Sequence, residues 1–442
     1  MVVGKRGISV LSAVMISVVV TATLVGAGAY FLLPGAEVPE EIEITMSDVE
    51  TFLADAESSE LTEVAEIIPQ DILASELKRP RDVTIGFIWS FPHDGSAWCA
   101  GSEISMEWMK EQYPYITAYR TEDVGPDKVT GIAESMIEEQ GCDMLFINDE
   151  WIGDPLFDIS EKYPDVWFHS HGNHLLASEN HLRYHGRVYQ VAYLHGLMAG
   201  ALTTTNNIGI VWAVHTWFLT QLTNAFALGV QEVNPDANIY GAFVWSWYDP
   251  PTELEVTESL LDMYDCDVVF SFTDSPVPHQ VCTERGVWSF APYGDMVQMG
   301  WLPEDSMVVS HYIFQRHVGW DKVFKAYMAG VKNPQLGNYY GYSEPLIIGD
   351  EVISGIDMSW NGKIGMEGIN PKAKELLPKE ILELVEMRRN QMIEGTFEPF
   401  RNYKMVDGKT GEVYSEAGEM PTDEQLMTDL WFIEGVIPPE EQ

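Results

Sequence analysis

Polar and aromatic side chains gather where the first apolar runs of the chain end. Asp94, Ser96 and Trp98 follow a run that ends near residue 90, and Asn148 follows another that ends at residue 147. A carboxylate, hydroxyl or amide can hydrogen-bond a ligand, and an indole offers a flat face for stacking. These residue types favour binding of a small ring. Asp94 is equally suited to cap the helix expected after it, and the two roles can coexist.

The second half of the chain repeats this pattern. Trp245 and Trp247 close one apolar run, and Asp274 and Asp295 each follow a further run. In a strand, residues two apart share a face, so both indoles are expected either in a cleft or in the core. This set suits an uncharged heteroaromatic ring with donor groups, such as a purine. Phosphates would call for arginine, lysine or a glycine-rich loop, which do not accompany these residues.

Catalytic and metal-binding patterns are missing from the sequence. It contains no GxSxG, HExxH or P-loop motif, and its serines, histidines and aspartates show no triad spacing. His169, His171 and His174 lie together after a strand, but their spacing matches no strong metal-ligand motif. We expect these histidines to be exposed or to cap a loop. No catalytic residue, metal or cofactor is therefore expected.

The composition excludes some partners. The 442 residues include 25 Lys and Arg against 68 Asp and Glu, a formal charge of -43, and the chain is 46% hydrophobic and 12% aromatic. Such an acidic surface repels phosphate backbones, so nucleic-acid binding is not expected. It also disfavours anionic ligands relative to neutral bases and nucleosides. The apolar content is too high for a largely disordered chain.

The four cysteines, Cys99, Cys142, Cys266 and Cys282, form no CxxC pair. Cys266 and Cys282 flank one expected strand and the helix that returns beside it. If this part lies outside the cell, these two residues are the favoured disulfide pair. Buried free thiols are an equally ordinary outcome.

The body of the chain alternates short apolar runs with amphipathic ones, which predicts parallel sheets with helices on both faces. Its length exceeds one ordinary core, so two lobes are expected. The first series has strands at 83–90, 116–119, 144–147 and 166–169, with helices at 102–112, 127–139 and 154–162. The second has strands at 208–213, 239–247, 268–272 and 287–291, with helices at 219–233 and 253–264. Ligands of such sheets bind beyond the carboxyl ends of the strands.

The N-terminal region predicts export. Lys5 and Arg6 precede an uncharged apolar run over 8–33, long enough to cross a bilayer as a helix with its short basic end in the cytoplasm. A retained anchor is favoured over a cleaved signal peptide. We assign 1–35 to the anchor or signal segment, 36–81 to an acidic stalk and 82–204 to lobe 1. Residues 205–307 form lobe 2, 308–333 return to lobe 1, and 334–442 complete lobe 2 with a C-terminal helical or extended segment.

Several segments resemble the basic membrane protein family of ABC-transporter solute-binding proteins, in particular its purine- and nucleoside-binding branch. They are GRVYQVAYLHGLMAG at 186–200, NIGIV at 207–211, WYDP at 247–250, EGTFEPF at 394–400 and WFIEGV at 431–436. The resemblance implies a type I periplasmic-binding-protein fold and no catalysis. It also implies a permease as partner and a site on the outer face of the membrane. Within it, Asp94, Ser96 and Trp98 match the ligand-contacting pattern after the first strand, and Asp295 matches an acidic position in lobe 2.

One departure from the family bears on the ligand. Nucleoside-binding members carry a Ser-x-x-Lys motif whose lysine holds the ribose, whereas this chain has SHYIF at 310–314. This favours a free nucleobase over a nucleoside. The alternatives are a sugar or other small ligand on the same fold, an anchored extracellular nucleoside hydrolase, and a structural cell-surface protein.

Overall fold

The computed structural model describes residues 83–331, 339–348 and 351–439. The expected anchor at 1–35 and stalk at 36–81 lie outside these residues. Within the described part of the chain, no helix is both long and apolar enough to cross a membrane.

The first sheet has six strands in the order β11-β5-β4-β3-β1-β2, and neighbouring strands are parallel. The MLFI of β3 is a completely buried apolar run, which suits a strand covered on both faces, whereas the equally buried β4 and β5 carry histidine, serine and arginine. The strands are β1 (Thr84–Ile88), β2 (Thr117–Thr121), β3 (Met144–Ile147), β4 (Trp167–His171), β5 (His181–Gly186) and β11 (Tyr339–Tyr340). The helices are α5 (Ala97–Gln112), α6 (Val129–Glu138), α7 (Glu150–Gly153), α8 (Leu156–Lys162), α13 (His317–Met328) and the 3-10 turn η2 (His174–Leu176).

The second sheet has eight strands in the order β15-β14-β10-β9-β8-β6-β7-β18, with β14 and β15 antiparallel to their neighbours. Its strands are β6 (Asn207–Trp212), β7 (Asn238–Phe243), β8 (Val268–Ser271), β9 (Trp288–Ala291), β10 (Val308–Phe314), β14 (Ile356–Trp360), β15 (Lys363–Ile364) and β18 (Val436–Ile437). Its helices are α9 (Tyr189–Leu202), α10 (Trp217–Val233), α11 (Pro250–Tyr264), α12 (Val277–Arg285), α14 (Pro371–Leu376), α15 (Lys379–Ile393) and the 3-10 turn η3 (Gly365–Glu367). The smaller elements are β12 (Leu346–Ile348), β13 (Glu351–Ile353), α16 (Pro399–Asn402), β16 (Met405–Val406), β17 (Val413–Ser415) and α17 (Asp423–Leu426).

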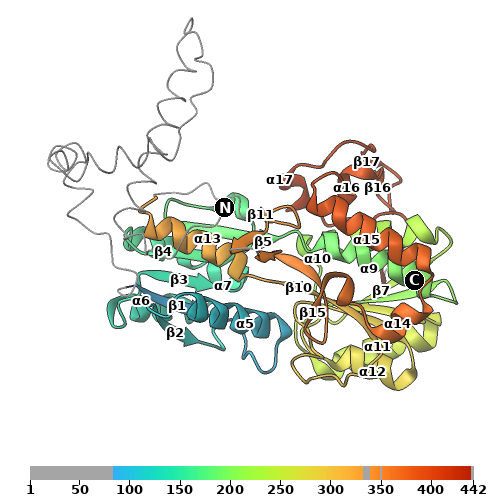
Figure 1. The fold of residues 1–442 in the computed structure, drawn as a ribbon, viewed down its shortest axis with the longest axis horizontal. Helices are drawn as coiled ribbons and strands as arrows, with labels where there is room; N and C mark the ends of the chain where they lie inside the picture. The colour runs from blue at the N-terminus through green and yellow to red at the C-terminus, as the bar shows by residue number, and fades with distance from the viewer. Residues whose placement is uncertain (1–82, 332–338, 349–350, 440–442) are drawn as a thin grey trace, which may run out of the picture. The chain divides into compact units, whose positions relative to one another are not determined.

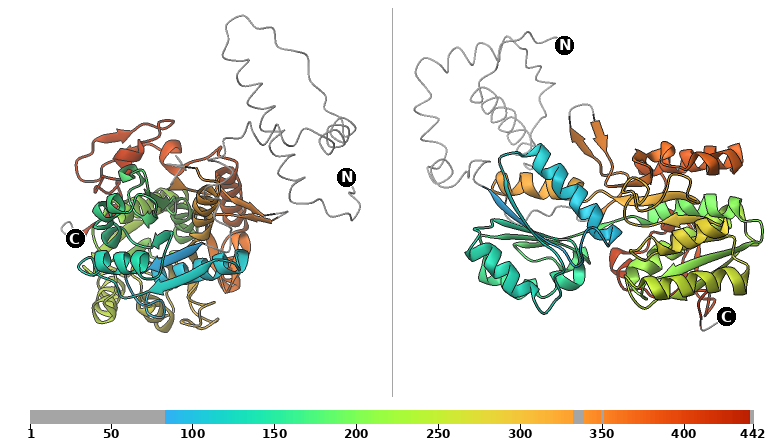
Figure 2. Two further views of the ribbon diagram at one scale, coloured as in Figure 1. Left: turned by 90° about the vertical axis from the view of Figure 1, so that its left-hand side faces the viewer. Right: turned by 90° about the horizontal axis from the view of Figure 1, so that it is seen from below.

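The chain passes between the two sheets several times (Figure 1). It leaves the first sheet after β5 and returns after β10, when α13 packs beside α5 and β4 (Figure 2). We expected the return at residue 308, but β10 pairs with β9 and β14 in the second sheet. The crossing therefore begins at Gln315, where the strand has ended.

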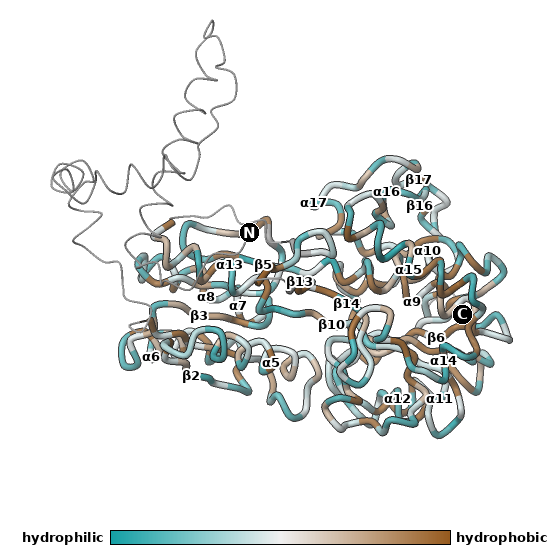
Figure 3. The backbone as a smooth tube through the Cα atoms, in the orientation of Figure 1, coloured by the Kyte–Doolittle hydropathy of each residue, from teal (hydrophilic) through white to brown (hydrophobic). Residues whose placement is uncertain are grey.

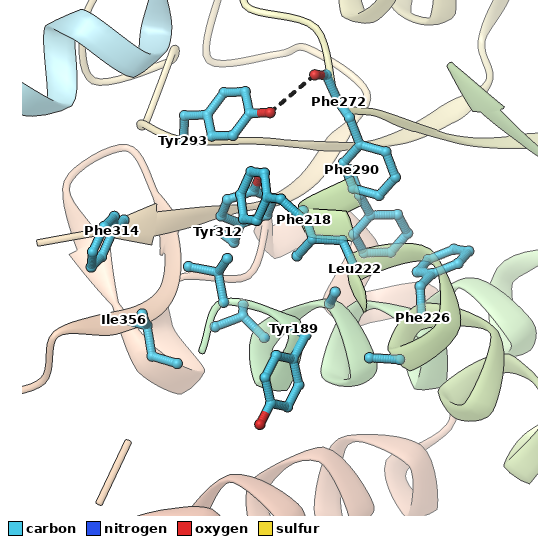
Figure 4. Packing of buried hydrophobic residues seen from close by; sticks show 14 of the residues in the cluster. Tyr189, Phe218, Leu222, Phe226, Phe272, Phe290, Tyr293, Tyr312, Phe314 and Ile356 are labelled. Carbon is cyan, nitrogen blue, oxygen red and sulfur yellow. Dashed lines mark hydrogen bonds between the residues drawn. The ribbon is translucent and has the colours of Figure 1, made fainter. Parts of the chain in front are cut away.

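Apolar strands and close helix packing form the core of the second lobe (Figure 3). Gly196 of α9 faces α10, where a Cβ atom would lie 2.0 Å from the Phe226 carbonyl oxygen. Glycine at this position therefore lets the two helix backbones touch. Figure 4 shows the aromatic core nearby, where the Tyr293 hydroxyl donates to the Phe272 carbonyl at 3.1 Å.

Two expectations about local structure were wrong. The helix after β1 begins at Ala97, not at residue 102, and its cap is Ser96, whose hydroxyl accepts from the Cys99 amide. Strand β7 ends at Phe243, so Trp245 and Trp247 do not share the face of a strand. Trp245 instead has a φ of 61°, an uncommon conformation for a bulky residue, and the chain turns there.

The disulfide was also not found. Cys99, Cys142, Cys266 and Cys282 are free and buried, so the alternative of buried thiols holds. Burial raises the pKa of the Cys266 thiol to about 12, so it stays protonated and behaves as a small apolar group.

Candidate functional site

A cavity of ≈ 90 Å³ lies where the carboxyl ends of strands from both sheets meet. Each lining segment follows or ends a strand: β1, β3 and β4 in the first sheet, and β6, β7, β8 and β9 in the second. This is the place that parallel α/β sheets offer to ligands. The lining residues are Phe91, Trp98, Asp149, Glu150, His171, Thr216, Trp217, Phe218, Trp247, Asp274 and Tyr293.

Aromatic rings form most of the cavity wall. Trp98, in the first turn of α5, is buried, and its ring meets that of Tyr293 edge-on at 5.2 Å and that of His171 at 4.7 Å. Its indole N–H donates to the Asn148 carbonyl at 2.9 Å. These contacts fix the indole in one orientation, which prepares it to meet a flat ligand without further ordering.

Arg316 covers one face of this indole. Its guanidinium carbon lies 3.9 Å from the Trp98 ring centre, and the side chain is completely buried. Burial lowers its pKa, while nearby groups, including Asp149 and Asp274, favour its charged form. The cation therefore offsets part of the acidic charge around the cavity, and Trp98 keeps at most one face for a ligand.

Asp274 joins the two lobes across the cavity. Ser96 donates its hydroxyl proton to the Asp274 carboxyl group at 2.5 Å, and the Ala97 amide donates to the Asp274 carbonyl at 3.1 Å. Burial raises the pKa of Asp274 to about 8. The hydrogen bond from Ser96 acts against this rise, and the negative charges of Asp149 and Glu253 add to it. A carboxyl group that keeps its proton at neutral pH can donate as well as accept.

A second, partly buried acid lines the same cavity. Asp149 follows β3, and its carboxylate accepts from the Ser90 hydroxyl at 3.0 Å. Burial raises the pKa of Asp149 to about 6, so this group is mainly ionised at neutral pH. The cavity thus combines ring faces with carboxyl groups of different protonation.

Three of the predicted site residues line the cavity: Trp98, Trp247 and Asp274. Ser96 lies at its edge through the bond to Asp274. Asn148 is completely buried, and its side chain accepts from the Ser90 amide at 3.2 Å and contacts the Cys99 sulfur, so it supports the wall without facing the cavity.

The other three do not line the cavity. Asp94 is exposed on the turn before α5. Trp245 is 69% exposed, with its ring stacked on Phe243. Asp295 accepts from the Ser359 hydroxyl at 2.7 Å and from the Gly362 amide at 2.9 Å, which ties its loop to the turn between β14 and β15.

The expectation for the histidines also needs correction. His169 and His171 are buried in the first lobe, neither exposed nor capping a loop. His171 lines the cavity and lies 2.9 Å from a ring nitrogen of His185 on the neighbouring strand. Burial lowers the pKa of His171 far below its usual value, so the ring is neutral. Among the described residues, no group of histidine, cysteine and carboxylate side chains could hold a metal.

Sequence reasoning missed several lining residues, and some carried a usable signal. Asp149 and Glu150 stand directly after Asn148, in the same polar segment at a strand end. Arg316 covers Trp98 without lining the cavity, and it follows the end of β10 by two residues, which is the position rule that found the others. Trp217 and Phe218 gave no such signal, because they look like the apolar face of a helix.

Comparison with known proteins finds a family match and several relatives. Residues 84–280 match a family described as ABC transporter substrate-binding protein, PnrA-like. A purine-binding protein of Brucella abortus is 24% identical over 68% of this chain and 77% of its own length. A protein of Haloferax volcanii, named as an ABC transporter glucose-binding protein, is 32% identical over 48% of this chain, and the match spans only 51% of its own length.

Solved structures agree on the fold. An ABC transporter solute-binding protein from Conexibacter woesei superposes with a TM-score of 0.54 and 17% identity, over 72% of this chain and 98% of that protein. The expected periplasmic-binding-protein-like α/β fold is thereby confirmed for the described lobes, as is the family resemblance. Residues 84–280 thus resemble the PnrA-like family of ABC transporter substrate-binding proteins, and the described lobes have the fold of a solute-binding protein.

Proposed function

We propose that the chain is the solute-binding protein of an ABC importer and captures a purine nucleobase in the cavity between its two lobes. The observation that supports this proposal most is that aromatic rings and carboxyl groups line the same small cavity. A planar ring with N–H donors uses both features. Stacking on an aromatic side chain is worth about 1–3 kcal/mol per base in nucleic-acid complexes.

A base suits the cavity better than a nucleoside or nucleotide. The segment at 310–314 lacks the ribose-binding lysine of related nucleoside receptors, and β10 here is SHYIF preceded by two valines. Among the described residues, no lysine or arginine lines the cavity, so a phosphate would lack a cationic partner there. The relative named for purine binding supports the same ligand class.

A sugar is the second candidate, because a relative is named for glucose binding and carbohydrates also stack on tryptophan. A hexose, however, carries hydroxyl groups around its whole edge, which call for more hydrogen-bond partners than this mostly aromatic wall offers. The purine therefore matches the wall more closely.

Thermal unfolding with a ligand panel tests the proposal. Adenine, guanine, the corresponding nucleosides and glucose are added at the same concentration, and a bound ligand raises the melting temperature. We expect the free bases to give the largest shift. A shift with glucose and none with any base would refute the purine assignment, and free base released from a nucleoside would refute the absence of catalysis.

We further propose that the N-terminal segment at 1–35 holds the lobes at the outer face of the membrane, where they meet a permease. In this proposal the permease receives the closed form, in which the two lobes enclose the ligand. The Ser96–Asp274 hydrogen bond, which links the two lobes, would belong to that closed form. Fractionation of cells expressing the full chain, followed by protease treatment of intact cells, checks the location. Protection of the lobes from external protease would contradict it.

A further inference from the structure

One carboxylate at the cavity, that of Glu150, has hydrogen-bond partners in other segments of the chain. Glu150 begins α7 and lines the cavity with 30% of its side chain exposed. One of its oxygens accepts from the Asn173 amide at 3.0 Å and from Arg183 at 3.4 Å. Trp217, in the other lobe, lines the same cavity, and its indole favours the charged form of Glu150. Partners from three segments leave the carboxylate one orientation.

Arg183 is the unusual member of this group. It lies on β5 with no exposed surface, its guanidinium sits over the Phe157 ring at 4.9 Å, and it also pairs with Asp154. A completely buried cation is costly without close acceptors, and Glu150 is the acceptor of Arg183 that also lines the cavity. Burial raises the pKa of Glu150, and the hydrogen bond from the Asn173 amide and the charge of Arg183 act against this rise.

Gly172 makes room for this pairing. A Cβ atom at that position would lie 2.3 Å from the Arg183 Nη1 atom and 2.9 Å from the Glu150 Cγ atom. Its φ of 141° is also a conformation that other residues rarely adopt. Glycine at this position therefore lets the Arg183 guanidinium approach the Glu150 carboxylate beside the cavity.

We propose that Glu150, positioned by Arg183, is the residue that selects among bound bases, by accepting hydrogen bonds from a ring edge with adjacent N–H donors. This inference rests on the proposed nucleobase function. An ionised carboxylate only accepts, so it pairs with an edge that offers two donors and repels an edge of bare ring nitrogens. On the edge of the six-membered ring, guanine presents two adjacent donors at N1 and N2, and adenine presents one amino group beside an acceptor nitrogen. Unsubstituted purine presents only acceptor nitrogens on that edge, since its one N–H lies on the imidazole ring.

Titration of intrinsic tryptophan fluorescence with guanine and with unsubstituted purine tests this inference. We expect the wild-type protein to bind guanine more tightly than unsubstituted purine. Glu150→Gln replaces one acceptor with a donor, so the guanine affinity falls by about tenfold or more, while the purine affinity stays the same or rises because the repelling charge is gone. The ratio of the two affinities is the readout, because a general loss of stability would lower both equally. An unchanged ratio in Glu150→Gln, or a wild-type preference for purine, overturns the inference.

Two further variants separate positioning from charge. Arg183→Met removes the guanidinium that positions Glu150, so we expect the ratio of guanine to purine affinity to fall, as in Glu150→Gln. Asp154→Asn is the matched control: it removes the other acid partner of Arg183, which is 57% exposed and does not line the cavity, and it leaves the ratio unchanged. If Arg183→Met does not fold, Gly172→Ala tests the same contact. A ratio that Asp154→Asn shifts as much as Glu150→Gln does would overturn the role of Glu150.

The two levels of the proposal fail differently. If the wild-type protein binds neither base, the nucleobase function is wrong. If it binds both and the ratio does not depend on Glu150, that function stands and this inference alone is wrong.

Discussion

Two neighbouring loops of the second lobe look alike in sequence and act differently in the structure. The loop after β8 carries Asp274 three residues beyond the strand, and the loop after β9 carries Asp295 four residues beyond it. Asp274 lines the cavity, whereas Asp295 turns away and Tyr293 takes the lining position. Tyr293 has a φ of 67°, which reverses the chain just before the acid. A carboxylate after a strand therefore marks the right edge of the sheet but not the direction of the side chain.

The same contrast separates two tryptophans and gives the largest expected effect. Trp98→Ala removes a buried indole from the cavity wall, so base affinity should fall by about tenfold to a hundredfold, in line with one lost stacking face. Trp245→Ala removes an indole that is 69% exposed and does not line the cavity, so affinity should stay within about twofold. Calorimetric titration of both variants makes the comparison. Equal losses would show that Trp245 reaches the ligand.

The two aspartates should separate binding from stability. Asp274→Asn keeps the shape of the side chain but not its proton, and we expect base affinity to fall by about tenfold, as for one lost hydrogen bond to a polar group. Asp295→Asn should leave affinity within about twofold and lower the free energy of unfolding by about 1–3 kcal/mol, because buried hydrogen bonds to Ser359 and Gly362 are disturbed. Titration and denaturant unfolding of each variant measure both quantities. A binding defect in Asp295→Asn with normal stability would remove the distinction between the loops.

The order of strands and helices could be predicted well from the sequence, because buried parallel strands are short apolar runs. The run at 144–147 was placed at its observed bounds. The site could be predicted only as an edge of the sheets. That rule correctly indicates Trp98, Trp247 and Asp274. Asp94 was expected to cap α5, but the cap is Ser96, two residues later in the chain. Positive φ angles at Trp245 and Tyr293 redirect the two other segments, and bulky residues give no sequence signal for such a turn.

Partners from distant parts of the chain were also beyond sequence reasoning. Arg316 stacks on Trp98, although more than two hundred residues separate them in the sequence. Arg183 and Glu150 meet only because β4 and β5 are neighbours and Gly172 is small. Such pairs follow from the register of strands, which a single sequence does not fix.

The smallest expected effect is a difference in pH dependence between the same two acids. Burial raises the pKa of Asp274 from 3.8 to about 8, so the folded protein holds a proton that the unfolded chain has lost. Its contribution should therefore make the free energy of unfolding fall as the pH rises from about 4 to about 8. Burial acts the same way on Asp295, but His311 and the hydrogen bonds from Gln298, Gly362 and Ser359 outweigh it and lower the pKa below 3.8. Asp295 should thus stabilise the fold above that pH and lose this effect as the medium becomes more acidic.

Chemical unfolding of both asparagine variants from pH 3 to pH 9 measures these opposite slopes. Relative to the wild-type protein, Asp274→Asn should lose stability least near pH 8, since it has no buried carboxyl group left to ionise. Asp295→Asn should show its largest deficit at neutral pH and converge with the wild-type protein at the acid end. Parallel curves for the two variants would mean that the two carboxyl groups share one environment. The difference between the loops would then lie only in the direction of their side chains.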